Sequence, residues 1–203
     1  MSEVELTQKQ IQDKKRREAQ KAKVNEAVAK ADIERGLLLV ITGNGKGKST
    51  AGFGNITRAL GHDQKVAVVQ FVKGTQACGE RNLLSSLGVP FHTMNTGFSW
   101  DSEDPERDKM AAQQAWAQAK KWLADPQYDV ILLDELTYMI TWGFIELADV
   151  LSSLSNRPTE MSVIITGRAA HRDLKALADT VSEVRPEKHA FQQGLKARIG
   201  IDW

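Results

Sequence analysis

Runs of consecutive apolar residues alternate along the chain with stretches of helical periodicity. Five strand-like runs cover residues 37–41, 66–72, 89–94, 128–135 and 161–168, and a last strand is predicted over residues 180–184. A strand with one face in water alternates apolar and polar residues, whereas a strand buried on both faces is apolar throughout. The pattern therefore predicts an α/β protein whose open, mostly parallel sheet carries helices on both faces.

Helical periodicity is clearest in the middle of the chain. Ala112, Trp116 and Leu123 fall on one face of a helix that begins near Pro105 and reaches about residue 124. The acidic stretch before Pro105 suits a helix start, because carboxylates and proline favour the first turn. Further helices are predicted over residues 51–60, 145–154 and 172–178.

The first 35 residues differ in character from the rest of the chain. They are highly charged and lack glycine and proline, so they predict a long helix that forms an arm (1–35) beside a domain of residues 36–203. Residues 14–23 carry six positive charges and one negative charge. This segment could be a solvated arm, a nucleic-acid contact or a mobile lid over an active site. No aromatic residue lies among the charges to stack on bases, which argues against nucleic acid.

Composition and charge narrow the class of protein. At 203 residues the chain is long enough for one domain with a buried core. A formal net charge of +1 provides no overall attraction to nucleic acid. No apolar run approaches the roughly 20 residues that span a bilayer, so no membrane association is expected. The N-terminus lacks a signal core, and the single cysteine, Cys78, excludes an internal disulfide. We therefore expect a cytoplasmic protein.

The strand at 37–41 leads into a glycine-rich turn that reads Thr-Gly-Asn-Gly-Lys-Gly-Lys-Ser-Thr over residues 42–50. Strand, glycine-rich turn, Lys-Ser and helix in this order are typical of a phosphate-binding loop. Backbone N–H groups and the positive end of the next helix would hold the phosphates. The ATP-binding candidates in this loop are Gly43, Asn44, Gly45, Lys46, Gly47, Lys48, Ser49 and Thr50. A glycine- and lysine-rich turn without a ligand is the alternative.

The loop is one residue shorter than the usual G-x-x-x-x-G-K-[ST] motif. Counting back from Gly47, the first glycine of that motif would stand at Thr42, but here it is Gly43. A shorter loop could hold a triphosphate differently from an ordinary nucleotide hydrolase. Lys48 would place its charge on the terminal phosphates, and the Ser49 hydroxyl could bind Mg²⁺.

A second nucleotide signal ends the strand at 128–135. Asp134 and Glu135 follow an apolar run, which is the Walker B arrangement, and a carboxylate there can hold Mg²⁺ directly or through water. The alternative is a purely structural acidic pair. Together with the phosphate loop, this strand predicts a P-loop NTPase-like (RecA-like) fold with an N-terminal helical arm.

Other candidates stand after the carboxyl ends of predicted strands, where ligands gather in open α/β sheets. Arg168 follows the strand at 161–168 and could bind a phosphate with two hydrogen bonds or form a structural salt bridge. Polar residues also follow the strand at 66–72, in a predicted loop that either lines the site or is solvated. They are Lys73, Glu80, Arg81 and Asn82.

Two aromatic rings occur in a segment without helical or strand periodicity. Phe98 and Trp100 lie within Asn-Thr-Gly-Phe-Ser-Trp, residues 95–100. Loop aromatics commonly pack into a core. The alternative is a hydrophobic wall against a flat ligand.

Taken together, the motifs resemble those of the P-loop type of ATP:corrinoid adenosyltransferase, also called cob(I)yrinic acid a,c-diamide or cob(I)alamin adenosyltransferase. The resemblance covers nearly the whole chain, and the short phosphate loop is itself typical of that family. Ser49 stands where the family often has threonine, and both residues supply a hydroxyl. The segments that carry the resemblance are 42–50, 69–74, 79–83, 96–100, 133–138, 164–168 and 178–183.

The resemblance implies a reaction in which the Co(I) of a reduced corrinoid attacks the 5′ carbon of ATP. The adenosyl group moves to cobalt and the triphosphate leaves intact. Lys48 and the loop would stabilise that triphosphate, with Mg²⁺ or Mn²⁺ held by Ser49 and Asp134 or Glu135. By motif match, Phe98 and Trp100 are catalytic and corrinoid-binding.

The resemblance also implies how the cobalt is reduced. Phe98 and Trp100 would displace the lower ligand of Co(II), so that a flavodoxin-type donor can reduce the four-coordinate corrinoid. The N-terminal helix would close over the corrinoid as a lid, and the protein would form a homodimer.

Two other functions remain as alternatives at this point. A small ATPase or kinase would use the same loop for phosphoryl transfer and would yield ADP. A nucleic-acid-binding module built on residues 14–23 would show steeply salt-dependent binding.

Overall fold

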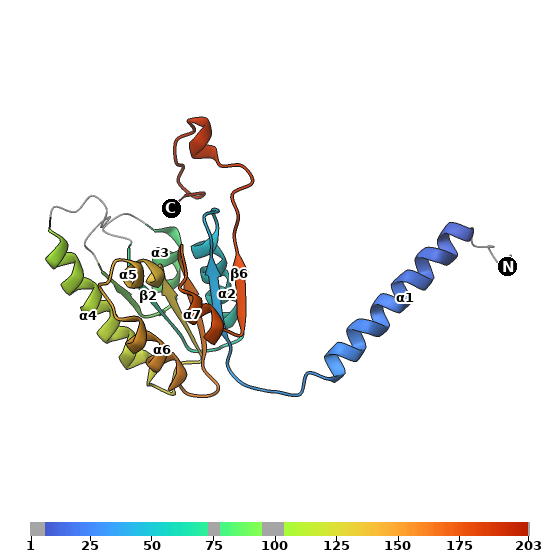
Figure 1. Ribbon diagram of the computed structural model, residues 1–203, viewed down its shortest axis with the longest axis horizontal. Helices are drawn as coiled ribbons and strands as arrows, with labels where there is room; N and C mark the ends of the chain where they lie inside the picture. The colour runs from blue at the N-terminus through green and yellow to red at the C-terminus, as the bar shows by residue number, and fades with distance from the viewer. Residues whose placement is uncertain (1–6, 73–77, 95–103, 203) are drawn as a thin grey trace. The chain divides into compact units, whose positions relative to one another are not determined.

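The computed structural model describes residues 7–72, 78–94 and 104–202 (Figure 1). The chain divides into two compact units between Glu34 and Arg35. No helix in the described ranges is both long and apolar enough to cross a membrane.

The first unit contains one helix, α1 (Gln8–Ala29). Its N-terminus has a capping box, in which the Thr7 side chain accepts from the backbone N–H of Gln10 and the Gln10 side chain accepts from that of Thr7. Every described residue of the helix is exposed. The prediction of a helix through residue 35 was wrong at its end, because residues 31–37 adopt no helical structure.

The second unit is built on a six-stranded sheet with the order β3-β2-β4-β5-β1-β6. Every strand pair in it is parallel, with β1 between β5 and β6. The strands are β1 (Leu38–Thr42), β2 (Val66–Gln70), β3 (Phe91–Thr93), β4 (Val130–Asp134), β5 (Ser162–Thr166) and β6 (Thr180–Glu183). Parallel strands place their carboxyl ends along one edge, so the phosphate loop, the acidic pair and Arg168 all follow strands at the same edge.

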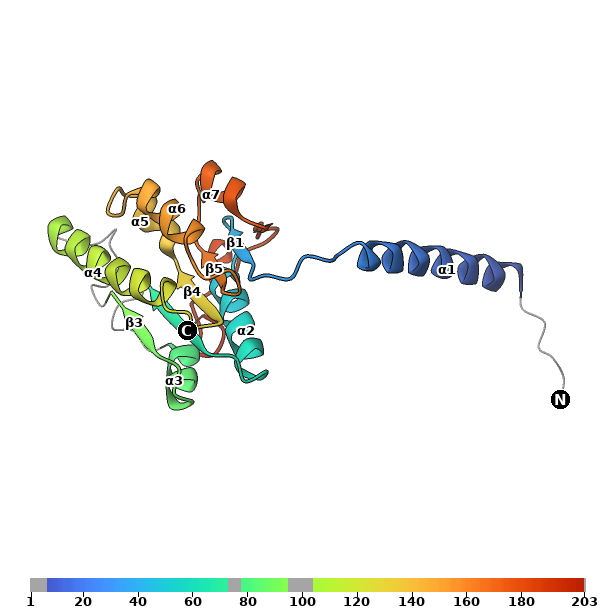
Figure 2. The same ribbon diagram turned by 90° about the horizontal axis from the view of Figure 1, so that it is seen from below.

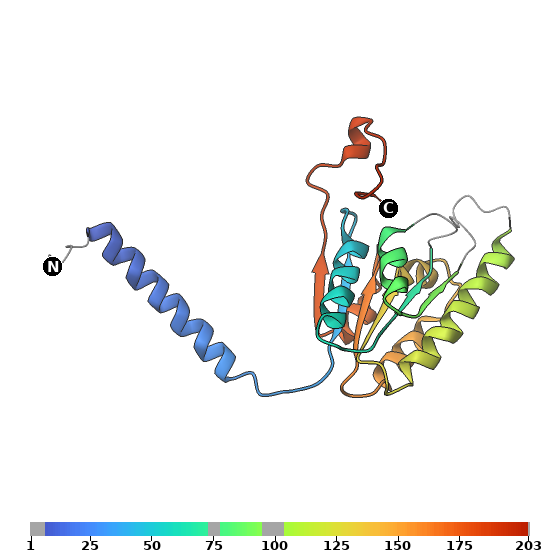
Figure 3. The ribbon, with the colours of Figure 1, turned by 180° about the vertical axis from the view of Figure 1, so that it is seen from behind.

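Helices cover both faces of the sheet (Figure 2). One face packs against α4 to α7 around Leu133 and Ile165, and the other packs against α2 and α3 around Leu132 and Ile164. Figure 3 shows the second face. The helices are α2 (Lys48–Leu60), α3 (Gly79–Ser86), α4 (Pro105–Leu123), α5 (Leu136–Thr141), α6 (Leu147–Ser155) and α7 (Arg172–Leu177), followed by the 3-10 helix η2 (Ala190–Gln193). The predicted α/β fold is confirmed.

Two helices were missed by the sequence patterns. Residues 79–82 were predicted as loop but begin α3, and the aperiodic stretch after Glu135 forms α5. Both helices are short, so their apolar residues do not repeat often enough to show a period. Packing defines them instead: Leu84 of α3 and Met139 of α5 are buried in opposite cores.

Asp179 accepts hydrogen bonds from residues at the start of β1 and just before it. The Arg35 guanidinium donates two hydrogen bonds to the Asp179 carboxylate, one of them 2.9 Å long, and the backbone N–H of Leu38 donates another at 2.8 Å. These hydrogen bonds stabilise the charged carboxylate, and the one from Arg35 has the larger effect. They lower the pKa of Asp179 to about 2.

We predict that Asp179→Asn lowers the free energy of unfolding by about 1–2 kcal/mol at pH 7, because the amide cannot accept both charged and backbone donors. The folded-state pKa lies below the unfolded value, so this stabilisation is complete above about pH 4 and declines as pH falls toward 2. Urea unfolding of both proteins at several pH values between 7 and 3 measures it. A difference that stays constant down to pH 3 would instead indicate lost packing.

Candidate functional site

The phosphate loop curls at the carboxyl end of β1. Gly43 and Gly47 have φ angles of 105° and 113°, in the region that favours glycine. The loop also packs tightly on the segment after β6, where the N–H of Gly45 donates to the Val184 carbonyl at 2.7 Å. A Cβ on Gly43 would lie 2.5 Å from the same carbonyl oxygen. The glycines are therefore required by backbone conformation and by close contact.

Helix α2 begins at Lys48 directly after this loop, three residues earlier than the predicted helix. Gly47 occupies the N-cap position and provides no side-chain hydrogen bond, so the first N–H groups of α2 remain available to an anion. The Lys48 ammonium donates to the Gly45 carbonyl at 2.6 Å. Burial lowers the pKa of Lys48, and the nearby charge of Arg168 lowers it further. The negative charge of a bound triphosphate would oppose both effects by stabilising the charged ammonium.

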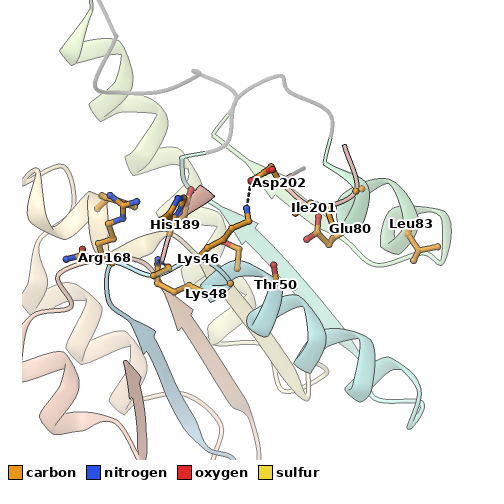
Figure 4. Close-up of a pocket in the computed structure, with 17 residues that line it drawn as sticks. Lys46, Lys48, Thr50, Glu80, Leu83, Arg168, His189, Ile201 and Asp202 are labelled. Atoms are coloured by element: carbon orange, nitrogen blue, oxygen red, sulfur yellow. Dashed lines mark hydrogen bonds and ion pairs between the residues drawn. The ribbon is translucent and has the colours of Figure 1, made fainter. Parts of the chain in front are cut away.

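A cavity of about 580 Å³ opens above the loop (Figure 4). Its lining comes from the loop, from α3, from the segments after β4 and β5, and from the C-terminal segment. The lining residues are Asn44, Gly45, Lys46, Gly47, Lys48, Ser49, Thr50, Gly79, Glu80, Leu83, Glu135, Tyr138, Arg168, His189, Gly200, Ile201 and Asp202.

The two acidic residues after β4 have different environments. Asp134 is fully buried, and its two carboxylate oxygens accept hydrogen bonds from Thr166 Oγ1 at 2.7 Å and Gln70 Nε2 at 3.2 Å. Glu135 is half-buried, lines the cavity and has left-handed backbone angles of φ 64° and ψ 21°. Of the two acidic residues, Glu135 is therefore the one that lines the cavity.

Arg168 reaches the cavity from an unusual turn after β5. Gly167 has a φ of 138°, and a Cβ there would lie 2.0 Å from Thr137 Oγ1. The Thr137 hydroxyl donates to the carbonyl of Arg168 at 2.7 Å, and Ala169 has a left-handed φ of 51°. A buried threonine and a glycine therefore hold the backbone that presents the Arg168 side chain.

The oxygen donors in the cavity fit a magnesium ion that is bound together with a phosphate. Mg²⁺ usually takes one or two carboxylates, with phosphates and water completing its coordination. Ser49 and Glu135 provide a hydroxyl and a carboxylate in the same cavity. In the parts of the chain that the structure describes, no group of three or more His, Cys, Asp or Glu residues could hold a metal without a nucleotide.

Comparison with known proteins identifies the family. The family model for ATP:corrinoid adenosyltransferase BtuR/CobO/CobP matches residues 34–203, most of the chain. This chain belongs to the ATP:corrinoid adenosyltransferase family. It is 55% identical over 188 residues to the corrinoid adenosyltransferase of Escherichia coli (strain K12), covering 93% of this chain and 96% of that relative. It is 43% identical over 201 residues to the corrinoid adenosyltransferase of Pseudomonas aeruginosa, covering 98% and 99%.

Among solved structures, the flagellar accessory protein FlaH from Methanocaldococcus jannaschii shares the fold of this adenosyltransferase. The TM-score is 0.50 at 15% sequence identity, over 74% of this chain and 72% of FlaH. Identity this low shows the fold alone.

Most of the site residues predicted from the sequence of this adenosyltransferase come together in the cavity. Residues 44–50, Glu135 and Arg168 line it, whereas Gly43 and the buried Asp134 are not among its lining residues. Phe98 and Trp100 lie outside the described residues, as does Lys73. Of the further candidates after β2, Glu80 lines the cavity and Arg81 and Asn82 are not among its lining residues.

Sequence reasoning missed the contribution of the C-terminal segment of this adenosyltransferase. His189, Ile201 and Asp202 line the cavity, and Asp202 forms an ion pair with Lys46 of the phosphate loop (Figure 4). Leu83 and Tyr138 were also missed, and burial raises the pKa of Tyr138. The basic tail carried no motif that could place it, because the contact joins residues 156 positions apart.

Proposed function

We propose that this protein transfers the 5′-deoxyadenosyl group of ATP to the Co(I) centre of a corrinoid, in adenosylcobalamin synthesis or salvage. Family membership supports the activity. The single observation that carries the assignment of the site is one cavity that unites a phosphate loop, a carboxylate and an arginine. In the reaction the Co–C bond forms as the bond between the 5′ carbon and its oxygen breaks, and that electron pair leaves with inorganic triphosphate.

The chain's own residues would bind and stabilise the leaving triphosphate. Negative charge builds on the bridging oxygen as the C–O bond breaks, so donors that are already in place lower the barrier. The N–H groups at the start of α2, the Lys48 ammonium and the Arg168 guanidinium line the cavity where this charge would lie. Lys48 is the proposed catalytic cation, and the loop from Gly43 to Thr50 is the proposed ATP site.

Mg²⁺ or Mn²⁺ would be held by Ser49 and Glu135, and when bound it supplies neutralising charge to the phosphates. Both side chains line the cavity. Asp134 would act from behind, because its oxygens already accept hydrogen bonds from Thr166 and Gln70. The sequence predicted that either acidic residue could bind the metal, and we now propose Glu135 as the direct ligand.

The corrinoid side of the site is proposed from the family resemblance. Phe98 and Trp100, outside the described residues, would displace the lower cobalt ligand and allow reduction of Co(II) by a flavodoxin-type donor. Residues 1–35 would act as a lid over the corrinoid, and two chains would form a homodimer in the cytoplasm. Sedimentation of the purified protein tests the dimer.

The products of the reaction test the proposed function. We predict that the protein with MgATP and chemically reduced cobalamin yields a light-sensitive Co–C species and one inorganic triphosphate per adenosyl group. Absorbance spectra before and after illumination measure the first product, and ion chromatography measures the second. A reaction that lacks corrinoid is the control and should consume no ATP. Release of ADP and phosphate would instead indicate the alternative, a small ATPase or kinase.

A further inference from the structure

A buried polar network joins three neighbouring strands behind the cavity. Gln70 ends β2, Asp134 ends β4 and Thr166 ends β5, and all three are fully buried. The Thr166 hydroxyl donates to one oxygen of Asp134 at 2.7 Å, and the Gln70 amide donates to the other at 3.2 Å. Because a buried carboxylate without partners is costly, these contacts keep Asp134 in one place.

The Thr166 hydroxyl makes a second contact, to the backbone of the next residue. Its oxygen accepts a hydrogen bond from the N–H of Glu135 at 2.9 Å. Glu135 has left-handed backbone angles, which non-glycine residues seldom adopt and which persist only where neighbouring groups hold them. One hydroxyl therefore bonds both residues of the acidic pair, as donor to the first and acceptor from the second.

The other side of Thr166 is held by the helix that follows the phosphate loop. Its methyl group lies beside Gly52 of α2, where an added Cβ would be 3.0 Å from Thr166 Cγ2. With the methyl against α2 and the hydroxyl between Asp134 and Glu135, the side chain is confined to one rotamer. Ser49 belongs to the same helix. Thr166 thus lies between the helix that carries Ser49 and the strand that leads to Glu135.

We propose that Thr166 is a positioning residue, whose hydroxyl holds the backbone of Glu135 so that the Glu135 carboxylate is presented to the metal that accompanies ATP. This inference rests on the proposed role of Ser49 and Glu135 in binding Mg²⁺. Asp134 serves as the fixed acceptor that orients the hydroxyl, and Gln70 holds Asp134 from its other side. Without the hydroxyl, the backbone N–H of Glu135 loses its hydrogen bond to Thr166, and the left-handed conformation of Glu135 is less well held.

The test measures how strongly Mg²⁺ and ATP favour each other's binding, without turnover. Calorimetric titration with ATP, in excess Mg²⁺ and separately in EDTA, gives two dissociation constants whose ratio is the metal coupling. Corrinoid is omitted. Thr166→Val keeps the shape and removes the hydroxyl, and we expect it to lower the coupling about tenfold, the loss expected for one hydrogen bond in a charged network. The affinity for ATP in EDTA should stay within about twofold of the wild type.

Two further variants separate positioning from stability. Thr166→Ser keeps the hydroxyl and should retain the wild-type coupling. Ser162→Ala lies at the other end of β5, where the serine hydroxyl accepts from the N–H of Leu37 at 3.1 Å, and should also retain it. Thermal melting establishes that each variant is folded. If Thr166→Val does not fold, Thr166→Ala removes the same hydroxyl without placing a methyl group against a carboxylate, and it carries the same prediction.

Three results have distinct meanings. Wild-type coupling in a folded Thr166→Val or Thr166→Ala protein would overturn the positioning role. Equal weakening of ATP binding with and without Mg²⁺ would also overturn it, because the threonine would then only support the fold. If the wild type itself binds ATP equally well in Mg²⁺ and in EDTA, the proposed metal site fails, whatever the variants do.

Discussion

Lys48→Ala is expected to lower kcat/KM by about 10²–10³, the range seen when one preorganised donor to a developing negative charge is removed. The Lys48 ammonium lines the cavity and is half-buried, so water screens its charge less than it would at a fully exposed position. Its lowered pKa reflects the same burial. The rate of Co–C bond formation from chemically prepared Co(I), measured by absorbance, tests the prediction directly.

Lys175→Ala is the matched control for this experiment. Lys175 is an exposed lysine in α7 and does not line the cavity, so its loss should leave the rate within about twofold of the wild type. Both variants should unfold at a similar temperature. Near-normal turnover by the Lys48→Ala protein would contradict a catalytic role for Lys48.

The double variant Phe98→Ala with Trp100→Ala is expected to react poorly from Co(II) and nearly normally from Co(I). The two rings are proposed to hold the corrinoid in the four-coordinate Co(II) state that accepts an electron. Their removal would destabilise that state by roughly 3 kcal/mol, which lowers the rate of the reaction from Co(II) about a hundredfold. Co(I) needs no such activation, because its reduction is already complete. Parallel assays with a reducing donor and with chemically reduced corrinoid measure the two rates.

Spectroscopy gives this second prediction an independent readout. Electron paramagnetic resonance of Co(II) corrinoid with the wild type and MgATP should reveal the four-coordinate species, which the double variant should lose. Equal losses in the Co(II) and Co(I) assays would point to lost corrinoid binding or to unfolding.

The sequence patterns predicted the sheet better than the short helices. Apolar runs located β1, β2, β4 and β5, because strands buried on both faces need apolar residues at nearly every position. The edge strands β3 and β6 are half-buried and exposed, respectively, and the segments that predicted them are less apolar. The short helices α3 and α5 have one or two turns, and their conformation depends on what Leu84 and Met139 pack against. A pattern along one segment does not contain that information.

For the site, the sequence alone located the candidate phosphate loop, the acidic pair and the arginine, because each follows directly after a predicted strand. Only the tertiary structure showed that Glu135 lines the cavity and Asp134 is buried, because the hydrogen bonds to Asp134 come from Thr166 and Gln70 on two other strands. The tertiary structure also brings Asp202 into an ion pair with Lys46, although the two residues are 156 positions apart in the sequence. Local spacing determines which chemical groups are present. The packing of distant strands determines which way each group points.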